Sequence, residues 1–199
     1  MLALISPAKK LDFETEPMLN DHTQPDLLSQ SEIQVKSARR LSRNQLAQTM
    51  KLSDNLADLN YQRYQDLSTP FDLGNAKQAA LVFNGDTYVG LQAGSLTKAD
   101  MKFAQNHLRI LSGLYGVLRP LDLIQPYRLE MGARFKPPRK TDLYDFWDGQ
   151  ITDALNQVID GQKDNTVVNC ASNEYFKSVK ARKLDGPVIT PVFKEIKDG

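Results

Sequence analysis

The stretch Leu111-Ser-Gly-Leu-Tyr-Gly-Val-Leu-Arg-Pro-Leu121 is apolar and contains two glycines, with two residues between them. Glycines allow a close approach of the backbone to a neighbour or a ligand, because they have no side chain. Arg109 and Arg119 lie on either side of the glycines. Backbone amides beside guanidinium groups suit a phosphate. The stretch therefore predicts either a phosphate-binding turn or a structural turn with Leu114 and Val117 in the core.

A helix-hairpin-helix element is one form that such a phosphate-binding turn can take. It holds duplex DNA without reading its sequence, by directing hairpin amides and the N-terminus of the next helix at a phosphate. The usual hairpin has one residue between its glycines, whereas Gly113 and Gly116 have two. Pro120 and Pro126 would also keep a following helix short. We expect a helix-hairpin-helix-like element at Gly113–Gly116, with the structural turn as the alternative.

Positive charge is concentrated around this turn, although the whole chain has a net charge of only +1. Residues 102–140 contain two acids, Asp122 and Glu130, and eight cations: Lys102, Arg109, Arg119, Arg128, Arg134, Lys136, Arg139 and Lys140. The window thus carries 8 − 2 = +6. Such segregation favours a polyanion such as DNA as the partner, and neutralising about six phosphates would give a log–log salt slope near −5. Ordinary solvated side chains are the alternative.

Apolar runs and helical periodicities alternate along the chain. We expect strands over 2–6, 79–84, 166–170 and 188–195. We expect a helical region opened by Pro25, then helices over 53–67, 97–108, 142–159 and 173–179. The 97–108 helix begins with a capping box formed by Thr97 and Asp100. This order predicts an α/β or mixed α+β fold, a central mixed sheet surrounded by helices in a single domain over residues 1–199.

The composition argues against several other classes of protein. The N-terminus lacks the basic region of a signal peptide, and no apolar run approaches ~20 residues, so we expect a cytoplasmic protein with no membrane partner. One cysteine and two histidines form no Cys/His metal cluster, and we expect no metal and no cofactor. Cys170 lies in an apolar strand, where a buried, unreactive side chain is the favoured interpretation and a nucleophile the other.

The sequence ends on Asp198-Gly199, a strong hairpin-turn signal with no strand after it. We expect the chain to be the N-terminal part of a longer protein.

Polar loops follow three of the expected strands. In open α/β sheets, ligands bind at the carboxyl ends of strands. A cleft containing Lys9, Asp86, Glu174 and Lys177 would bind a nucleotide or another phosphorylated small molecule, with the lysines on phosphates and a carboxylate as general base. This enzyme is the alternative to DNA binding; surface ion pairs and caps are the third interpretation. No catalytic residue is assigned.

Three blocks of the sequence resemble the YaaA peroxide stress protein family. They are Leu4-Ile-Ser-Pro-Ala-Lys9 with Leu11-Asp12, the long block Leu108–Gly132, and Ala171-Ser-Asn-Glu-Tyr-Phe-Lys-Ser-Val-Lys180. The resemblance covers essentially the whole chain.

The resemblance implies a bacterial protein of the peroxide response, linked to limiting damage from intracellular iron. It also implies an unusual α/β fold that binds DNA through a basic cleft and a helix-hairpin-helix element. On this chain, the expected hairpin is Gly113–Gly116 with Arg109 and Arg119 beside it. We expect the cleft to include Lys9, Lys10, Arg128 and Lys177. The oligomeric state and any enzymatic reaction stay open.

Overall fold

The apolar run Leu2–Ile5 forms β1, the middle strand of the main sheet, and both Leu2 and Leu4 are completely buried. The computed structural model describes residues 1–17 and 19–192. Its main sheet has the order β4-β3-β1-β6-β7. β1 pairs in parallel with β3 (Leu108–Ser112) and with β6 (Val167–Asn169). The carboxyl ends of these three strands therefore meet at one edge of the sheet.

One of the two outer strands makes the sheet mixed. β4 (Gly116–Leu118) pairs antiparallel with β3, whereas β7 (Val188–Ile189) pairs in parallel with β6. A second, two-stranded sheet pairs β2 (Lys77–Gln78) antiparallel with β5 (Leu123–Ile124). The expected α/β fold with a central mixed sheet is confirmed.

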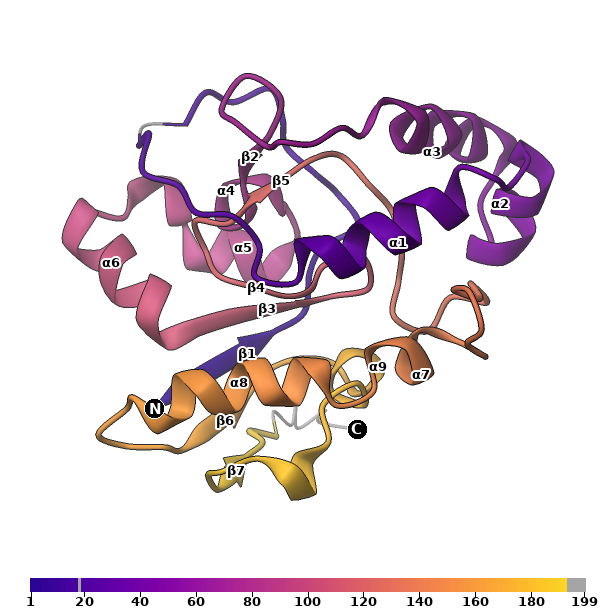
Figure 1. Ribbon diagram of the computed structural model, residues 1–199. Helices are drawn as coiled ribbons and strands as arrows, with labels where there is room; N and C mark the ends of the chain where they lie inside the picture. Colours follow the sequence, from indigo (N-terminus) through magenta and orange to yellow (C-terminus); the bar gives the residue numbers. More distant parts are fainter. Residues whose placement is uncertain (18, 193–199) are drawn as a thin grey trace, which may run out of the picture.

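Helices surround the sheet (Figure 1). They are α1 (Leu28–Ala38), α2 (Arg43–Met50), α3 (Asp54–Asp66), α4 (Ala79–Val82), α5 (Asp86–Leu91), α6 (Lys98–His107), α7 (Leu143–Trp147), α8 (Gln150–Asp160) and α9 (Asn173–Phe176), with short 3-10 turns η1 (Ala93–Ser95) and η2 (Ala181–Lys183). α6 begins with the expected capping box of Thr97 and Asp100. α8 packs Ile151, Leu155 and Ile159 into the core.

Two expected elements are wrong. The run 79–84 was expected as a strand, but α4 occupies its first four residues. Short apolar runs do not distinguish the two structures, and two alanines at its start favour a helix. The helix expected over 142–159 is two helices, because Asp148 adopts φ 37° and breaks it before Gly149. The first of them is capped by the Asp142 side chain, which accepts from the amide of Asp145.

The last expected strand is shorter where it is described. β7 covers Val188–Ile189, and the rest of the expected strand after residue 192, like the Asp198-Gly199 turn, lies outside the described residues. Among the helices that the structure describes, none has both the length and the apolar character needed to cross a bilayer.

The expected helix-hairpin-helix-like element at Gly113–Gly116 is also wrong, because this segment is the turn of the β3–β4 hairpin. Leu114 and Tyr115 at its tip are completely buried. Pairing with β1 extends the apolar residues before the turn into a strand, and the structural-turn alternative is the correct one.

The two glycines are required by protein contacts. A Cβ on Gly113 would lie 2.2 Å from the carbonyl oxygen of Leu129. Gly116 has φ +72°, and a Cβ there would lie 2.9 Å from the Trp147 ring. At both glycines, the backbone therefore lies close to core residues of the protein, and not to a phosphate as expected.

Candidate functional site

Two adjoining cavities of about 90 and 340 Å³ lie at the carboxyl edge of the main sheet. They share Lys9 after β1, Arg128 and Glu130 after β5, and Glu174 in α9. Lys51 and Arg134 also line the larger cavity. We call the surface formed by Lys9, Lys51, Arg128, Glu130, Arg134 and Glu174 the groove. It has four cations and two carboxylates, a formal charge of 4 − 2 = +2.

The loops that follow β1 and β6 are tied together beside the groove. The amide of Ser172 donates to Oγ of Ser6 over 2.9 Å, and the two hydroxyls lie 3.3 Å apart. The strand-end rule thus placed these two loops correctly.

The segment 125–134, which carries most of the groove, is fixed by hydrogen bonds from three directions. The Tyr64 hydroxyl in α3 donates to the carbonyl of Arg128 over 2.8 Å. The amide of Gly132 donates to Oε1 of Glu174 over 2.8 Å. The amide of Arg134 donates to the carbonyl of Thr49 in α2 over 3.1 Å. The groove is therefore held in place before any ligand binds, which lowers the entropic cost of binding.

α2 and α3 form a packed helical pair joined by a tight turn that borders the groove. Lys51 ends α2 in the left-handed conformation, φ 53°, and Ser53 precedes α3. Ser53 makes no side-chain cap, so α3 begins with first-turn amides that its cap residue does not satisfy. A helix N-terminus favours an anion, and the first turn of α3 already carries the carboxylate of Asp54.

The ion pairs leave part of the positive charge of the groove uncompensated. Glu130 lies 3.0 Å from Arg128 and 3.7 Å from Lys9. Among the described residues, no carboxylate lies within 4.0 Å of the charged groups of Lys51 or Arg134, and both side chains are exposed. Burial, and next the neighbouring Arg128, hold the pKa of Arg63 in α3 below its usual value.

The smaller cavity has uncharged aromatic walls. Tyr127 and Tyr175 line it, and burial raises the pKa of both phenols. They stay protonated at neutral pH and add no negative charge to the site.

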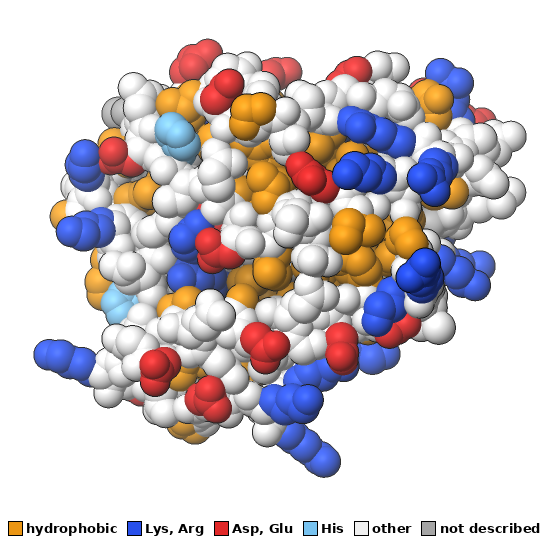
Figure 2. Space-filling model, viewed as in Figure 1, with side chains coloured by type: hydrophobic (Ala, Val, Ile, Leu, Met, Phe, Trp, Pro, Cys, Tyr) orange, Lys and Arg blue, Asp and Glu red, His pale blue; other side chains and the backbone are white. Residues whose placement is uncertain are grey.

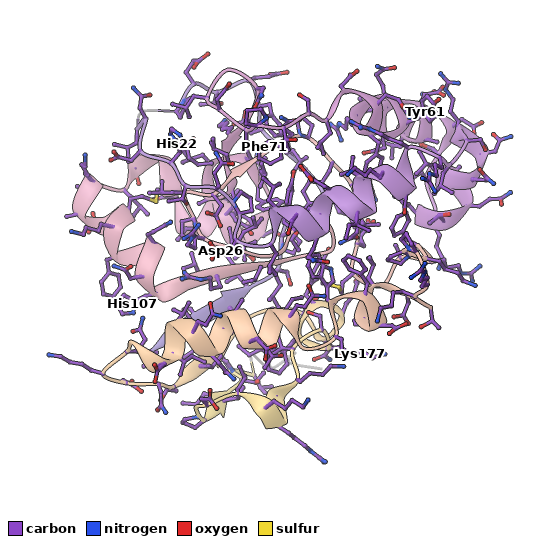
Figure 3. All side chains as sticks on the ribbon, viewed as in Figure 1. His22, Asp26, Tyr61, Phe71, His107 and Lys177 are labelled. Carbon is purple, nitrogen blue, oxygen red and sulfur yellow. The ribbon has the colours of Figure 1, made fainter. Side chains whose placement is uncertain are left out.

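Lys and Arg side chains are unevenly distributed on the surface. Figure 2 shows them gathered on the right-hand side of the view, over α1 to α3 and the segment that precedes α7. Figure 3 shows the labelled Lys177 beside α9 on the right, whereas His107 lies at the left end of the molecule.

Arg109 and Arg119 lie apart from the groove. Arg109 is 7% exposed, and its Nη1 donates to the carbonyls of Gln105 and Leu108. Arg119 contacts Asp122 over 2.9 Å and Asp26 over 3.0 Å. The cations expected around the paired glycines are therefore divided. Arg109 and Arg119 make their contacts within the protein, and neither lines the groove cavities.

The other expected cations lie nearer the groove. Lys9 and Arg128 line both cavities. Lys10 is exposed next to Lys9, and its carbonyl accepts from the amide of Asn84. Lys177 lies over the ring of Tyr144, 4.7 Å from its centroid, and the Tyr144 hydroxyl donates to the carbonyl of Glu174.

The cleft expected for the enzymatic alternative is only partly assembled. Lys9 and Glu174 line the same cavities, whereas Asp86 and Lys177 line neither of them. Cys170 is exposed and lies just beyond the end of β6, so the expectation that it is buried within a strand is wrong. Among the described residues, no three His, Cys, Asp or Glu side chains are grouped so that they would hold a metal ion.

Sequence reasoning missed Lys51 and the α2–α3 turn as parts of the groove. A signal was present, because Ser42 followed by Gln45 forms a capping box that starts α2. The turn itself has no glycine, and a lysine takes its left-handed position. A helix end without glycine gives little signal in a sequence.

Comparison with known proteins shows the family to which this chain belongs. The model of the family described as "Peroxide stress protein YaaA" matches residues 1–199. The chain belongs to the YaaA peroxide stress protein family. A curated relative, the UPF0246 protein of Paraburkholderia phytofirmans, is 54% identical over 201 residues, which cover 100% of this chain and 77% of the relative. The resemblance that the sequence blocks indicated is confirmed, and with it a role in peroxide stress.

Proposed function

We propose that this YaaA-family chain binds DNA in the cytoplasm during peroxide stress, holding phosphates in the groove without reading base sequence. The observation that carries the proposal is that Lys51 and Arg134, both exposed, border a preformed cationic groove beside a helical pair. Phosphate contacts position DNA but carry no sequence information.

In this proposal, the α2–α3 pair is the helix-hairpin-helix-like element, in place of Gly113–Gly116. Two packed helices, a tight turn and the N-terminus of the second helix are the components of a helix-hairpin-helix element. The Thr49 and Tyr64 contacts connect this pair to the segment that carries Arg128 and Arg134. One phosphate backbone can therefore meet the turn and the groove together.

The proposal also accounts for the link to intracellular iron that the family resemblance implies. Peroxide and ferrous iron damage exposed DNA, and DNA held in the groove would be shielded from them. This role requires bound DNA and no metal site on the chain.

Fluorescence anisotropy with two duplexes of unrelated sequence tests the proposal. We expect Lys51→Glu and Arg134→Glu to weaken binding to both duplexes alike, each by about tenfold, and to flatten the salt dependence by at least about one unit of slope. The matched control is Lys163→Glu, an exposed lysine near Met1 at the amino edge of the sheet. Equal loss in the control, or full affinity in both groove variants, would refute the groove as the DNA site.

A further inference from the structure

A separate cavity of about 310 Å³ lies between the segment after Asp12 and the helices α4 and α5. It shares no lining residue with the groove. Its volume is within the range of small-molecule sites. One wall of the cavity begins at Asp12, shortly after Lys9 and Lys10. The amide of Asp12 donates a hydrogen bond to the carbonyl of Val82 in α4.

Lys77 of β2 enters this cavity from the core and is only 6% exposed. Its ammonium donates to the carbonyls of Asp12 and Thr15 over 2.8 and 2.6 Å. The Asp12 carboxylate lies 3.7 Å away, beyond hydrogen-bond distance. An ammonium has three N–H donors. Among the described residues, the third donor has no acceptor within hydrogen-bond distance, so a buried charged donor is available to a ligand.

The walls of the cavity combine apolar and polar groups. Phe83 and Leu81 provide apolar surface, whereas Glu16 and Asn84 provide acceptors and an amide donor. Asp12 and Glu16 both line the cavity, and with Lys77 they give it a formal charge of 1 − 2 = −1. Amides of Glu14 and Thr15 bond to the Asp12 carboxylate, and such bonds, chiefly that of Thr15, lower its pKa to about 2. The cavity therefore disfavours a phosphate.

We propose that this cavity binds a neutral nucleobase or nucleoside. Lys77 donates its third N–H to a carbonyl or ring nitrogen, as lysine does to guanine O6 and N7. The carboxylate of Glu16 accepts from an N–H of the base, and the ring lies against Phe83 and Leu81. A base has adjacent hydrogen-bond donors and acceptors at its edge and an apolar face. It can therefore contact Lys77, Glu16 and the Phe83 side chain at the same time.

Saturation-transfer NMR and calorimetry with guanosine, adenosine, cytidine and thymidine, each beside its 5′-monophosphate, test this proposal. We expect at least one nucleoside to bind and its monophosphate to bind about tenfold more weakly, because of repulsion by the carboxylates. Lys77→Met should lower the affinity for the nucleoside by about tenfold or more, as expected for the loss of a charged hydrogen bond. Lys98→Met is the control, since Lys98 is exposed and does not line the cavity.

A second variant separates binding from folding. Val89 is 63% exposed at the rim, so Val89→Trp should close the cavity while the melting temperature and DNA affinity stay unchanged. Failure of every nucleoside to bind the wild-type protein would overturn the proposal. So would binding that survives both Lys77→Met and Val89→Trp, or a preference for free amino acids over nucleosides.

Discussion

Arg119 contacts Asp122, which is 1% exposed, and the same carboxylate accepts from the Thr23 hydroxyl over 2.6 Å. Removing the arginine leaves a buried carboxylate without its charged partner. We expect Arg119→Gln to lower the free energy of unfolding by about 3 kcal/mol, the size found when one member of a buried ion pair is lost. Urea unfolding measures the loss, and DNA affinity of the folded variant should stay at the wild-type value. Weakened DNA binding by a stably folded Arg119→Gln would instead support the sequence-based assignment of Arg119 to DNA binding.

Asp12 gives a second prediction at the scale of one residue. Hydrogen bonds, chiefly from Thr15, lower its pKa from 3.8 to about 2. Because the folded pKa is lower than the unfolded value, this stabilisation is complete above about pH 4 and is lost as the pH falls through about 2. Urea unfolding of wild type and Asp12→Asn should therefore differ most above pH 4, and the difference should shrink towards pH 2. A constant difference over this range would contradict the assignment.

At the scale of elements, the β3–β4 hairpin depends on the absence of a side chain at Gly113. A Cβ there would meet the backbone of Leu129, which cannot move without the segment that carries the groove. We expect Gly113→Ala to destabilise the protein by at least about 3 kcal/mol, at the upper end of overpacking effects. Gly90→Ala in α5 is the control, because nothing lies within 4 Å of its Cβ position. Thermal unfolding should show the control unchanged or slightly stabilised, by up to about 1 kcal/mol; equal effects of both variants would contradict this account.

At the scale of the whole molecule, folding separates four of the eight cations of the 102–140 window into two places. Arg109 and Arg119 make hydrogen bonds and ion pairs within the protein, whereas Arg128 and Arg134 line the groove together with Lys9 and Lys51. One phosphate contact for each of the four groove cations predicts a log–log salt slope of at most about −3.6 for duplex DNA, because Glu130 already pairs with Arg128 and Lys9. The charge of the window alone predicts a slope near −5. Anisotropy titrations between 50 and 300 mM salt, roughly the range over which such binding weakens measurably, separate the two values.

Local sequence determined those parts of the fold that rest on interactions between near neighbours. β1 follows from a short apolar run, and the start of α6 follows from the Thr97–Asp100 capping box. The strand-end rule also brought Lys9 and Glu174 to one edge, because parallel strands place their carboxyl ends together. The sequence blocks alone also indicated the family, which the comparison confirmed.

Only the tertiary structure decided which cations line the groove and why the glycines are present. Leu129 and Trp147, 16 and 31 residues beyond Gly113 and Gly116, occupy the space that a phosphate was expected to fill. Lys51 and Arg134 line the same cavity because α2 packs on the 125–134 segment, where the Thr49 carbonyl accepts from the amide of Arg134. Such contacts join residues far apart in the chain, and periodicity, composition and caps report only on neighbours.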